Sequence, residues 1–273
     1  MINIPPVAIT KTLGLFLGSV LAYVSCDKNN NLSFFSVEND LKLGQKVDQQ
    51  IKNDSQFPIL DSSQHPQAYS YLDSMTRAIL ASDAVAYGEE FAWEFKIIDD
   101  SESLNAFATP GGYIYVYSGL IKFLPEPDAL AGVLAHEIAH ADLRHTSRNL
   151  QRQYGVSILL AILLGQDPGQ LQQIAGQVAG TLSGLSFSRK FERESDSKSV
   201  EYLADTEYGC QGAKIFFQKL EESGQGGETP QFLSTHPSPD NRVTNIEEKA
   251  AKLGCATNLQ KPTRYQRFQN SLP

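Results

Sequence analysis

The segment Ala129–Ala141 constrains the fold most, because it combines an apolar surface with three ionisable side chains. Apart from His136, Glu137 and His140, all of its residues are apolar or glycine. A helix that is apolar on every side is buried in the protein core. Three ionisable groups on a buried helix are costly unless something compensates them. A bound metal ion is the simplest compensation.

The three ionisable residues have the spacing H-E-x-x-H, completed by Ile138 and Ala139. Because four residues make about one helical turn, His136 and His140 project from the same face and can bind one zinc ion. Glu137 can take a proton from an attacking water molecule without being a ligand itself. A chance match to this pattern at the protein surface would lie among polar residues, whereas this one lies in an apolar segment. The apolar setting therefore favours a catalytic zinc site.

A catalytic zinc ion takes three protein ligands and keeps one position open, so a third ligand is required. The extended pattern H-E-x-x-H-x-x-G-x-x-H is excluded. Leu143 stands at its glycine position and Thr146 at its last histidine position. His145 comes one residue too early, and we interpret it as a polar residue at a helix end.

The other candidate for the third ligand is a carboxylate in residues 188–196, which contain Glu192, Glu194 and Asp196. Glu192 and Asp196 are four residues apart and share a helix face, whereas Glu194 lies about 200° round the helix from Glu192. Glu192 would bind zinc, and Asp196 would accept a hydrogen bond from a ligand imidazole. A solvated charge run that pairs with neighbouring basic residues is the alternative.

Apolar periodicity predicts a chain that is helical except for three central strands. The strands are expected at Phe91–Ile98, Asn105–Thr109 and Tyr113–Tyr117. A last helix is expected to end near Leu253, with Ser238 as its N-cap and Pro239 as its first helical residue. The other helices are expected at Ser36–Lys52, Pro66–Ser82, Ala129–Ala141, Leu185–Asp205 and Gln211–Glu222. Gly155–Gly165 and Leu171–Leu185 predict a packed helical hairpin, with a membrane-touching element as the alternative.

Four motifs in this order resemble the gluzincin peptidases related to the CAAX prenyl protease and HtpX. The resemblance is closest to the secreted bacterial branch typified by LoiP and BepA. The motifs are residues 105–112, 136–140, 188–196 and 234–242. The resemblance implies an α+β fold, a mainly helical zincin-like metallopeptidase domain with a small antiparallel sheet. The chain ends soon after the last motif, so we expect the single-domain architecture of LoiP without the tetratricopeptide repeats of BepA.

The resemblance also implies site residues. Glu192 would be the third zinc ligand and Glu137 the general base. Asp196 would have a supporting role, described in some relatives as that of a proton donor. His236 would lie near the metal, where the histidine of BepA-like relatives can fill the fourth zinc position and hold the enzyme inactive. A surface-loop histidine is the alternative for His236.

One strand is expected to border the active site as an edge strand that binds substrate. An exposed edge offers backbone N–H and C=O groups to an extended polypeptide without demanding a sequence. The Pro-Gly-Gly that follows would end this edge, and an ordinary hairpin corner is the alternative. The residues of the strand are Asn105, Ala106, Phe107, Ala108 and Thr109.

The first residues predict export and a lipid anchor. Lys11 precedes the apolar run Leu13–Val24, which is too short for a membrane span. Ser25 before Cys26 resembles a bacterial lipobox, in which the cysteine carries lipid; a simple signal peptide or a buried N-terminal helix is the alternative. The lipid would hold the protein in the cell envelope, at the outer membrane and facing the periplasm. The expected parts are a signal at 1–25, a tether at 26–34, the zinc metallopeptidase domain at 35–255 and a polar C-terminal tail at 256–273.

The composition of the chain limits the kinds of partner and metal site that it can have. The chain has 273 residues and a formal net charge of -8. Such an acidic balance argues against a nucleic-acid partner, which needs a basic face. No C-x-x-C pair occurs, so a cysteine zinc site is disfavoured. Cys210 and Cys255 are open to two interpretations, a disulfide or two small buried hydrophobic side chains.

These observations predict a zinc-dependent endopeptidase with one zinc ion per chain. Its substrates would be unfolded or misassembled envelope proteins, bound in extended form. The alternative from another class is a zinc-containing chaperone or assembly factor of the outer membrane, in which proteolysis is latched or minor. A thermolysin-like secreted peptidase is a third interpretation, against which the short chain and the loop of His236 argue.

Overall fold

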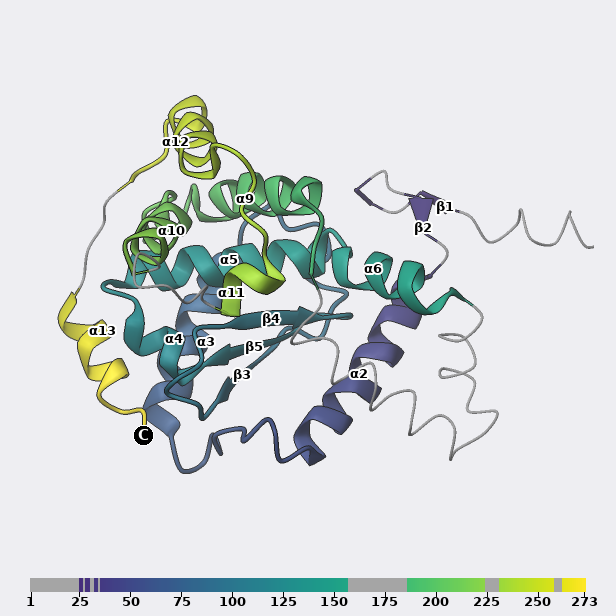
Figure 1. Ribbon diagram of the computed structural model, residues 1–273, viewed down its shortest axis with the longest axis horizontal. Coiled ribbons are helices and arrows are strands. Elements are labelled where there is room, and N and C mark those ends of the chain that lie inside the picture. Colours follow the sequence, from purple (N-terminus) through teal and green to yellow (C-terminus); the bar gives the residue numbers. More distant parts are fainter. Residues whose placement is uncertain are drawn as a thin grey trace, which may run out of the picture.

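In the computed structural model of the chain, the three predicted strands form one sheet in the order β3-β5-β4 (Figure 1). β3 (Glu94–Ile98) is parallel to β5 (Tyr113–Tyr117), whereas β4 (Ala106–Thr109) is antiparallel to β5. The sequence-based prediction of an antiparallel sheet is therefore wrong for β3, and the sheet is mixed. Alternating apolar residues predict a strand and its two faces, but they do not encode the direction of the neighbouring strand.

The turn between β4 and β5 requires glycine. Gly111 and Gly112 have φ angles of +77° and +89°, a region that other residues seldom adopt. A Cβ atom at Gly112 would also lie 3.1 Å from side-chain atoms of Phe91 and Trp93. The tight turn places β4 at the outer edge of the sheet and β5 in its middle.

The structure describes residues 25, 26, 28, 29, 32, 33, 35–156, 186–223, 231–257 and 262–273. The expected signal segment up to residue 24 and most of the expected helical hairpin, residues 157–185, lie outside these residues. In the described ranges, no helix combines the length and the apolar character needed to cross a bilayer. A short antiparallel pair, β1 (Ser25–Cys26) and β2 (Leu32–Ser33), precedes the main body.

The helices largely follow the predicted pattern. Two of them begin at serine N-caps: the Ser36 hydroxyl accepts from the backbone N–H of Asn39 at 3.1 Å, and the Ser188 hydroxyl from that of Phe191 at 3.2 Å. The helices are α2 (Val37–Asn53), α3 (Pro66–Leu80), α4 (Ser118–Phe123), α5 (Pro127–Asp142), α6 (His145–Tyr154), α9 (Arg189–Leu203), α10 (Gly212–Ser223), α11 (Gln231–Thr235), α12 (Arg242–Leu253) and α13 (Pro262–Gln269).

Helix α12 begins later than predicted. Its N-cap is Asn241, in the left-handed conformation with a φ of +58°. The expected roles of Ser238 and Pro239 as N-cap and first helical residue are therefore wrong, and both lie in the loop before the helix. Asn241 makes the turn into α12, and the proline-rich loop before it is not helical.

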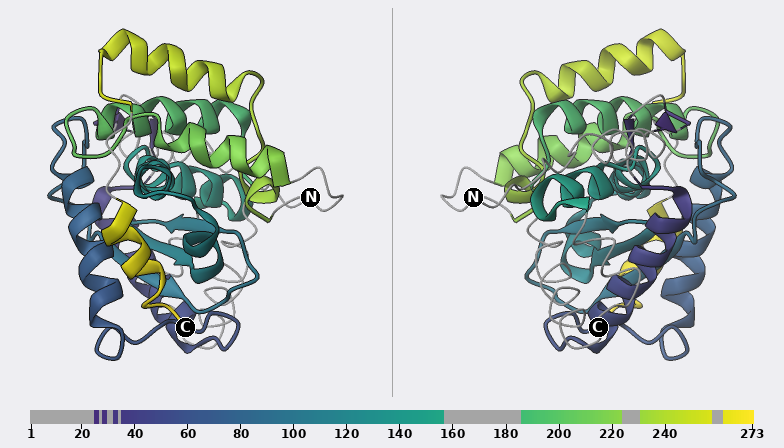
Figure 2. Two further views of the ribbon diagram at one scale, coloured as in Figure 1. Left: turned by 90° about the vertical axis from the view of Figure 1, so that its left-hand side faces the viewer. Right: turned by 90° about the vertical axis from the view of Figure 1, so that its right-hand side faces the viewer.

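Helix α5 is the centre of the fold. It packs on the sheet through β4 and, on its other side, on α9 and α10 (Figure 1). Helix α12 lies outside α9 and α10 (Figure 2). Every residue of α5 is buried, as the apolar segment predicts. Gly132 permits the close approach of α10, since a Cβ there would lie 2.0 Å from the backbone nitrogen of Ala213.

The two faces of the sheet bury different side chains. Ile114 and Val116 of β5 belong to the main core with α3 and α5, whereas Tyr115 belongs to a second core with α2. The Tyr115 hydroxyl donates to Oδ1 of Asp48 at 2.6 Å, and Nζ of Lys96 lies 2.7 Å from the same oxygen. This buried network attaches α2 to the sheet.

The end of α5 is tied to the start of α2. Arg144, which follows α5, has a φ of +58°, and α6 begins at the next residue. Nε of Arg144 donates to Oδ2 of the buried Asp40 at 2.5 Å, and Nη2 donates to the carbonyl of Phe35 at 2.6 Å. The ion pair fixes the end of the helix that carries the H-E-x-x-H motif.

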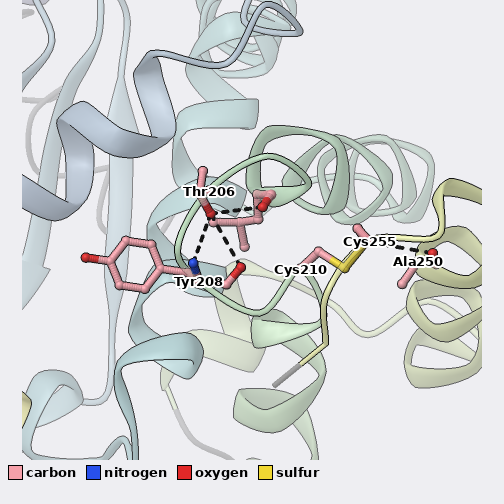
Figure 3. Close-up of a disulfide and its surroundings, with 6 residues drawn as sticks. Thr206, Tyr208, Cys210, Ala250 and Cys255 are labelled. Carbon is pink, nitrogen blue, oxygen red and sulfur yellow. Dashed lines mark hydrogen bonds between the residues drawn. A yellow bond between two sulfur atoms is a disulfide. The ribbon is translucent and has the colours of Figure 1, made fainter. Parts of the chain in front are cut away.

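A disulfide joins Cys210 and Cys255 (Figure 3). It links the segment before α10 to the residues that follow α12, and the backbone N–H of Cys210 donates to the carbonyl of Ala256 at 2.8 Å. Of the two interpretations that the sequence leaves open for these cysteines, the structure has the disulfide. The disulfide holds the start of α10 next to the end of α12.

The C-terminal residues pack on the body of the protein. Tyr265 and Phe268 of α13 are buried, and the Phe268 ring stacks on Tyr71 of α3 with 4.5 Å between centroids. The Tyr265 hydroxyl donates to the carbonyl of Ile121 at 2.9 Å. The segment expected as a polar tail thus contains a helix whose aromatic side chains complete the core.

Candidate active site

His136 and His140 lie one turn apart on α5 and direct their Nε2 atoms at the same point. The two Nε2 atoms are 3.0 Å apart, and both rings are fully buried. The two Nδ1 atoms have other neighbours: Nδ1 of His136 lies 3.0 Å from Oδ1 of Asp196, and Nδ1 of His140 lies 3.2 Å from Nδ1 of His145. One nitrogen of each ring therefore faces a common point, and Nη2 of Arg242 lies 3.4 Å from that nitrogen of His136.

Glu192 reaches both imidazoles from the first turn of α9. Its Oε2 lies 3.5 Å from Nε2 of His136, and its Oε1 lies 3.4 Å from Nε2 of His140. Asp196, one turn further along α9, meets the other nitrogen of His136. Both carboxylates are buried, so a solvated charge run does not describe them. The pair chosen from helical spacing is the pair that faces the H-E-x-x-H residues.

His236 joins the group from the loop that follows α11. Its Nδ1 lies 3.2 Å from Oε1 of Glu192 and 3.4 Å from Nε2 of His136. Its ring stacks on Phe232, with 4.1 Å between centroids. His236 is fully buried, so it is not a surface-loop histidine. The ligand atoms of His136, His140, Glu192 and His236 all lie within 4.8 Å of one another.

Glu137 is buried beside this group. In the described part of the chain, neither of its carboxylate oxygens has a hydrogen-bond partner. Oε1 lies 3.4 Å from Nε2 of His236. Burial raises the pKa of Glu137, and the nearby His236 acts against this shift. A carboxylate with open acceptor positions and a raised pKa is suited to taking and giving a proton.

The electrostatics differ between the members of the group. Burial lowers the pKa of His140 well below its ordinary value, so the ring is neutral. Burial acts to raise the pKa of Glu192, but the surrounding histidines hold it well below its ordinary value. Burial also acts to lower the pKa of His136, but Asp196 and Glu192 raise it to about 9. An ion would therefore meet one carboxylate and one neutral imidazole, and would displace a proton from His136.

Arg242 is a residue of the site that the sequence analysis does not identify. Its Nη2 donates to Oε2 of Glu192 at 2.9 Å and to Oδ1 of Asp196 at 2.8 Å. Its guanidinium group lies over the ring of Phe217, 3.6 Å from the centroid. Arg242 belongs to the fourth motif, but no local spacing predicts a contact with a residue 50 positions away.

His145 stands at a helix end, as expected, but it also contacts the site. Its ring is buried and stacks on Phe191, with 4.1 Å between centroids. Its Nε2 lies 3.1 Å from Oε2 of Glu194, the carboxylate that helical spacing sets apart from Glu192. Burial lowers the pKa of His145. The signal in the sequence is a third histidine five residues after His140, which the sequence analysis interprets only as a polar residue at a helix end.

The strand expected to bind substrate, β4 with Asn105 before it, is an outer strand of the sheet and packs on α5. Its side chains are buried. The carbonyl of Ala108 accepts a hydrogen bond from the Thr146 hydroxyl at 2.9 Å, and the carbonyl of Leu104 accepts one from the backbone N–H of Phe232 at 3.1 Å. Helices α6 and α11 therefore contact the region of this edge.

Comparison with known proteins identifies the family. The sequence profile of Peptidase family M48 matches residues 66–250, which include His136, His140, Glu192 and His236. The chain belongs to peptidase family M48. The match spans the sheet, α5, α9 and the loop of His236, so it covers every element that carries the site.

Curated relatives agree with this family. The chain is 27% identical over 236 residues to the mitochondrial metalloendopeptidase OMA1 of Schizosaccharomyces pombe, covering 86% of this chain and 68% of that protein. It is 29% identical over 229 residues to a putative beta-barrel assembly-enhancing protease of Vibrio cholerae, and 26% identical over 232 residues to the beta-barrel assembly-enhancing protease of Escherichia coli. These matches cover 80% and 81% of this chain, but only 45% and 46% of the bacterial relatives.

The donor set fits the zinc on which M48 peptidases depend. Imidazole nitrogens with a glutamate oxygen are a common ligand set for catalytic zinc. Ligand atoms bonded to one tetrahedral zinc ion lie roughly 3.4 Å apart, close to the 3.0 to 3.5 Å separations between the Nε2 and Oε atoms here. The family, its metalloendopeptidase relatives and this group of residues make the chain a zinc metalloendopeptidase.

Proposed function

We propose that the chain hydrolyses peptide bonds in unfolded or misassembled proteins of the bacterial cell envelope. The observation that carries this proposal is the buried group of His136, His140 and Glu192, beside which the Glu137 carboxylate has no hydrogen-bond partner among the residues that the structure describes. The bacterial relatives are named as beta-barrel assembly-enhancing proteases, which supports envelope proteins as the substrates.

The proposed ligands are Nε2 of His136, Nε2 of His140 and the carboxylate of Glu192. A zinc ion in this site supplies Lewis-acid chemistry, because it polarises a carbonyl group and lowers the pKa of water. Asp196 holds the ring of His136 through its contact with Nδ1, so that Nε2 remains turned toward the metal position. The proposed stoichiometry is one zinc ion per chain.

Glu137 is the proposed general base. Its carboxylate takes a proton from the attacking water molecule and passes it to the leaving nitrogen of the scissile bond. Two observations support the role: within the described ranges both carboxylate oxygens lack hydrogen-bond partners, and burial raises the pKa of the group.

The proposed substrate path runs along β4, from Asn105 to Thr109. An extended peptide can pair with the outer strand of a sheet. The backbone N–H of Phe232 in α11 donates to the carbonyl of Leu104, which precedes Asn105, and this contact supports a position of α11 at the start of the proposed path. Substrate entry would therefore require α11 to move and the hydrogen bond from Thr146 of α6 to the Ala108 carbonyl to break. His236 would leave the metal group with α11. In this account His236 latches the enzyme.

The proposed location is the outer membrane, with lipid on Cys26 and the peptidase facing the periplasm. The Ser-Cys sequence after the apolar run Leu13–Val24 supports this assignment, and so do the bacterial relatives. Mass spectrometry of the mature N-terminus in cells tests it. A lipidated Cys26 is expected, and an unmodified Met1 would contradict the anchor.

The proposed activity is tested with casein and the variant Glu137→Gln. The amide keeps the size of the side chain but cannot act as a base, so the rate should fall by about 10²- to 10⁴-fold. The zinc content of the variant should remain that of the wild type, because Glu137 is not among the proposed ligands. Wild-type cleavage by a zinc-loaded Glu137→Gln protein would end the proposal.

A second candidate function is a chaperone or assembly factor of the outer membrane whose proteolysis is latched or minor. The observation that favours it is the complete burial of the site, with His236 in contact with both Glu137 and Glu192. The same Glu137→Gln variant separates the two functions. A binding function survives this substitution, whereas a proteolytic function is lost.

A further inference from the structure

The two histidines of the H-E-x-x-H motif are held by different partners. Nδ1 of His136 faces a carboxylate, that of Asp196. Nδ1 of His140 instead faces Nδ1 of His145 at 3.2 Å, and Nε2 of His145 lies 3.1 Å from Oε2 of Glu194. A line of contacts therefore runs from the second histidine of the motif through another buried imidazole to a carboxylate on α9.

The direction of the hydrogen bonds along this line follows from metal ligation. If His140 binds zinc through Nε2, its only ring proton is on Nδ1. That N–H can donate only to an unprotonated Nδ1 of His145. The proton of His145 is then on Nε2, where it donates to Glu194. The reverse direction would place a proton on Nε2 of His140 and prevent ligation.

We propose that His145 is a positioning residue for His140, and that Glu194 fixes the tautomer of His145. A ligand histidine usually donates its second N–H to a carboxylate, a carbonyl or water, which orients the ring. At His140 the neutral imidazole of His145 takes the place of that partner, and the carboxylate of Glu194 contacts His145 instead of His140. The inference rests on the proposed role of His140 as a zinc ligand.

The surroundings of His145 hold its ring in the required plane. The ring is parallel to Phe191 within 6° at 4.1 Å, and the Ser195 hydroxyl lies 3.3 Å from Nδ1. Glu194 is partly exposed and lies 3.6 Å from Nζ of Lys190. Its effect on zinc binding should therefore be smaller than that of His145.

The test measures the zinc affinity of the full chain by competition with a chromogenic chelator. His145→Phe keeps an aromatic ring against Phe191 but removes the acceptor. Its zinc affinity should fall about 10- to 100-fold, the range found when such outer partners are lost. His145→Asn places an acceptor oxygen near the position of Nδ1 and should recover most of this loss of affinity. Glu194→Ala should lower the affinity less than His145→Phe.

Arg193→Ala is the matched control, because it removes an exposed side chain next to Glu194 on the same helix and leaves the line of contacts intact. It should leave zinc affinity within about twofold. Zinc affinity of His145→Phe within twofold of the wild type would overturn the proposal, as would His145→Asn binding no better than His145→Phe. A wild-type chain that takes up no zinc would instead overturn the proposed function.

The tautomers give a second readout that needs no variant. Long-range ¹H–¹⁵N spectra of the zinc-loaded wild-type chain report which ring nitrogens carry protons. The proposal expects protons on Nδ1 of His140 and Nε2 of His145, with Nδ1 of His145 unprotonated. A proton on Nδ1 of His145 would contradict it, whether or not the variants fold.

Discussion

Nη2 of Arg242 lies 2.9 Å from Oε2 of Glu192, so a cation at the start of α12 touches the carboxylate proposed to bind zinc. The same nitrogen lies 2.8 Å from Oδ1 of Asp196. All three side chains are buried, and the two carboxylates come from one helix. Arg242 therefore compensates charges that would otherwise repel each other in the absence of metal.

Arg242→Met should destabilise the metal-free chain more than the zinc-loaded chain. Removal of one partner from a buried ion pair costs about 3–5 kcal/mol, because the other charge stays buried without compensation. A zinc ion supplies positive charge at the same carboxylate and should offset part of this cost. Melting temperatures with and without zinc measure the difference, and Arg242→Lys, which keeps the charge, serves as control. Equal losses in both states would contradict this role.

His236→Ala should raise basal casein cleavage and weaken zinc binding. The ring contacts Glu192 and Glu137, and its removal opens the position that a substrate would need. We expect at least a severalfold rise in rate at saturating zinc. Ser238→Ala, an exposed change in the same loop, is the control and should leave both quantities unchanged. If His236→Ala leaves activity and zinc affinity as they were, the latch is refuted.

Gly132→Ala should disturb the packing of α5 on α10. A Cβ at this position would lie 2.0 Å from the backbone nitrogen of Ala213, so the helices must move apart. Overpacking of this kind costs about 1–3 kcal/mol, which corresponds to a fall in melting temperature of roughly 2–12 °C. At Gly88 the nearest atom would be 3.7 Å away, so Gly88→Ala is the control and should change little. Equal melting temperatures for the two variants would contradict the close approach.

Asp48 should make stability depend on pH in the acidic range. Burial acts to raise its pKa, but hydrogen bonds with Lys52, Lys96 and Tyr115 lower it below the ordinary value of 3.8. A depressed folded-state pKa means that the unfolded chain binds the proton more readily, so the stabilisation is present above pH 3.8 and is lost as pH falls through the folded-state pKa.

Urea unfolding of the wild type and Asp48→Asn tests this sign. The difference in free energy of unfolding should be largest near neutral pH and should shrink as the pH falls below 3.8. Asp83→Asn removes an exposed acid and controls for the general effect of losing a charge. A difference between wild type and Asp48→Asn that stays constant across this range would contradict the argument.

The parts of the site that lie on one helix could be predicted from the sequence. Four-residue spacing places His136 with His140, and Glu192 with Asp196, because helix geometry is local. Arg242 and the partnership of His145 with Glu194 could not be predicted in this way. They depend on how α12 and α6 dock against α9, which is decided by packing between distant segments.

In the fold, too, features that depend on local spacing could be predicted, and features that depend on distant segments could not. The apolar segment Ala129–Ala141 predicts a buried helix, and the alternation in Phe91–Ile98 predicts a strand, because each pattern reports a local period. Neither pattern shows that β3 runs parallel to β5. The composition of Ser238 and Pro239 also predicts the wrong start for α12, because the turn into the helix is made at Asn241.

The central claim is that His136, His140 and Glu192 together hold one zinc ion. The most direct measurement is the zinc content of the purified, folded full chain, for the wild type and for Glu192→Ala. We predict one zinc ion per wild-type chain, and little or none in Glu192→Ala when its circular dichroism spectrum shows a folded protein. A folded wild-type chain that binds no zinc, or a Glu192→Ala chain that binds zinc as tightly as the wild type, would contradict the claim.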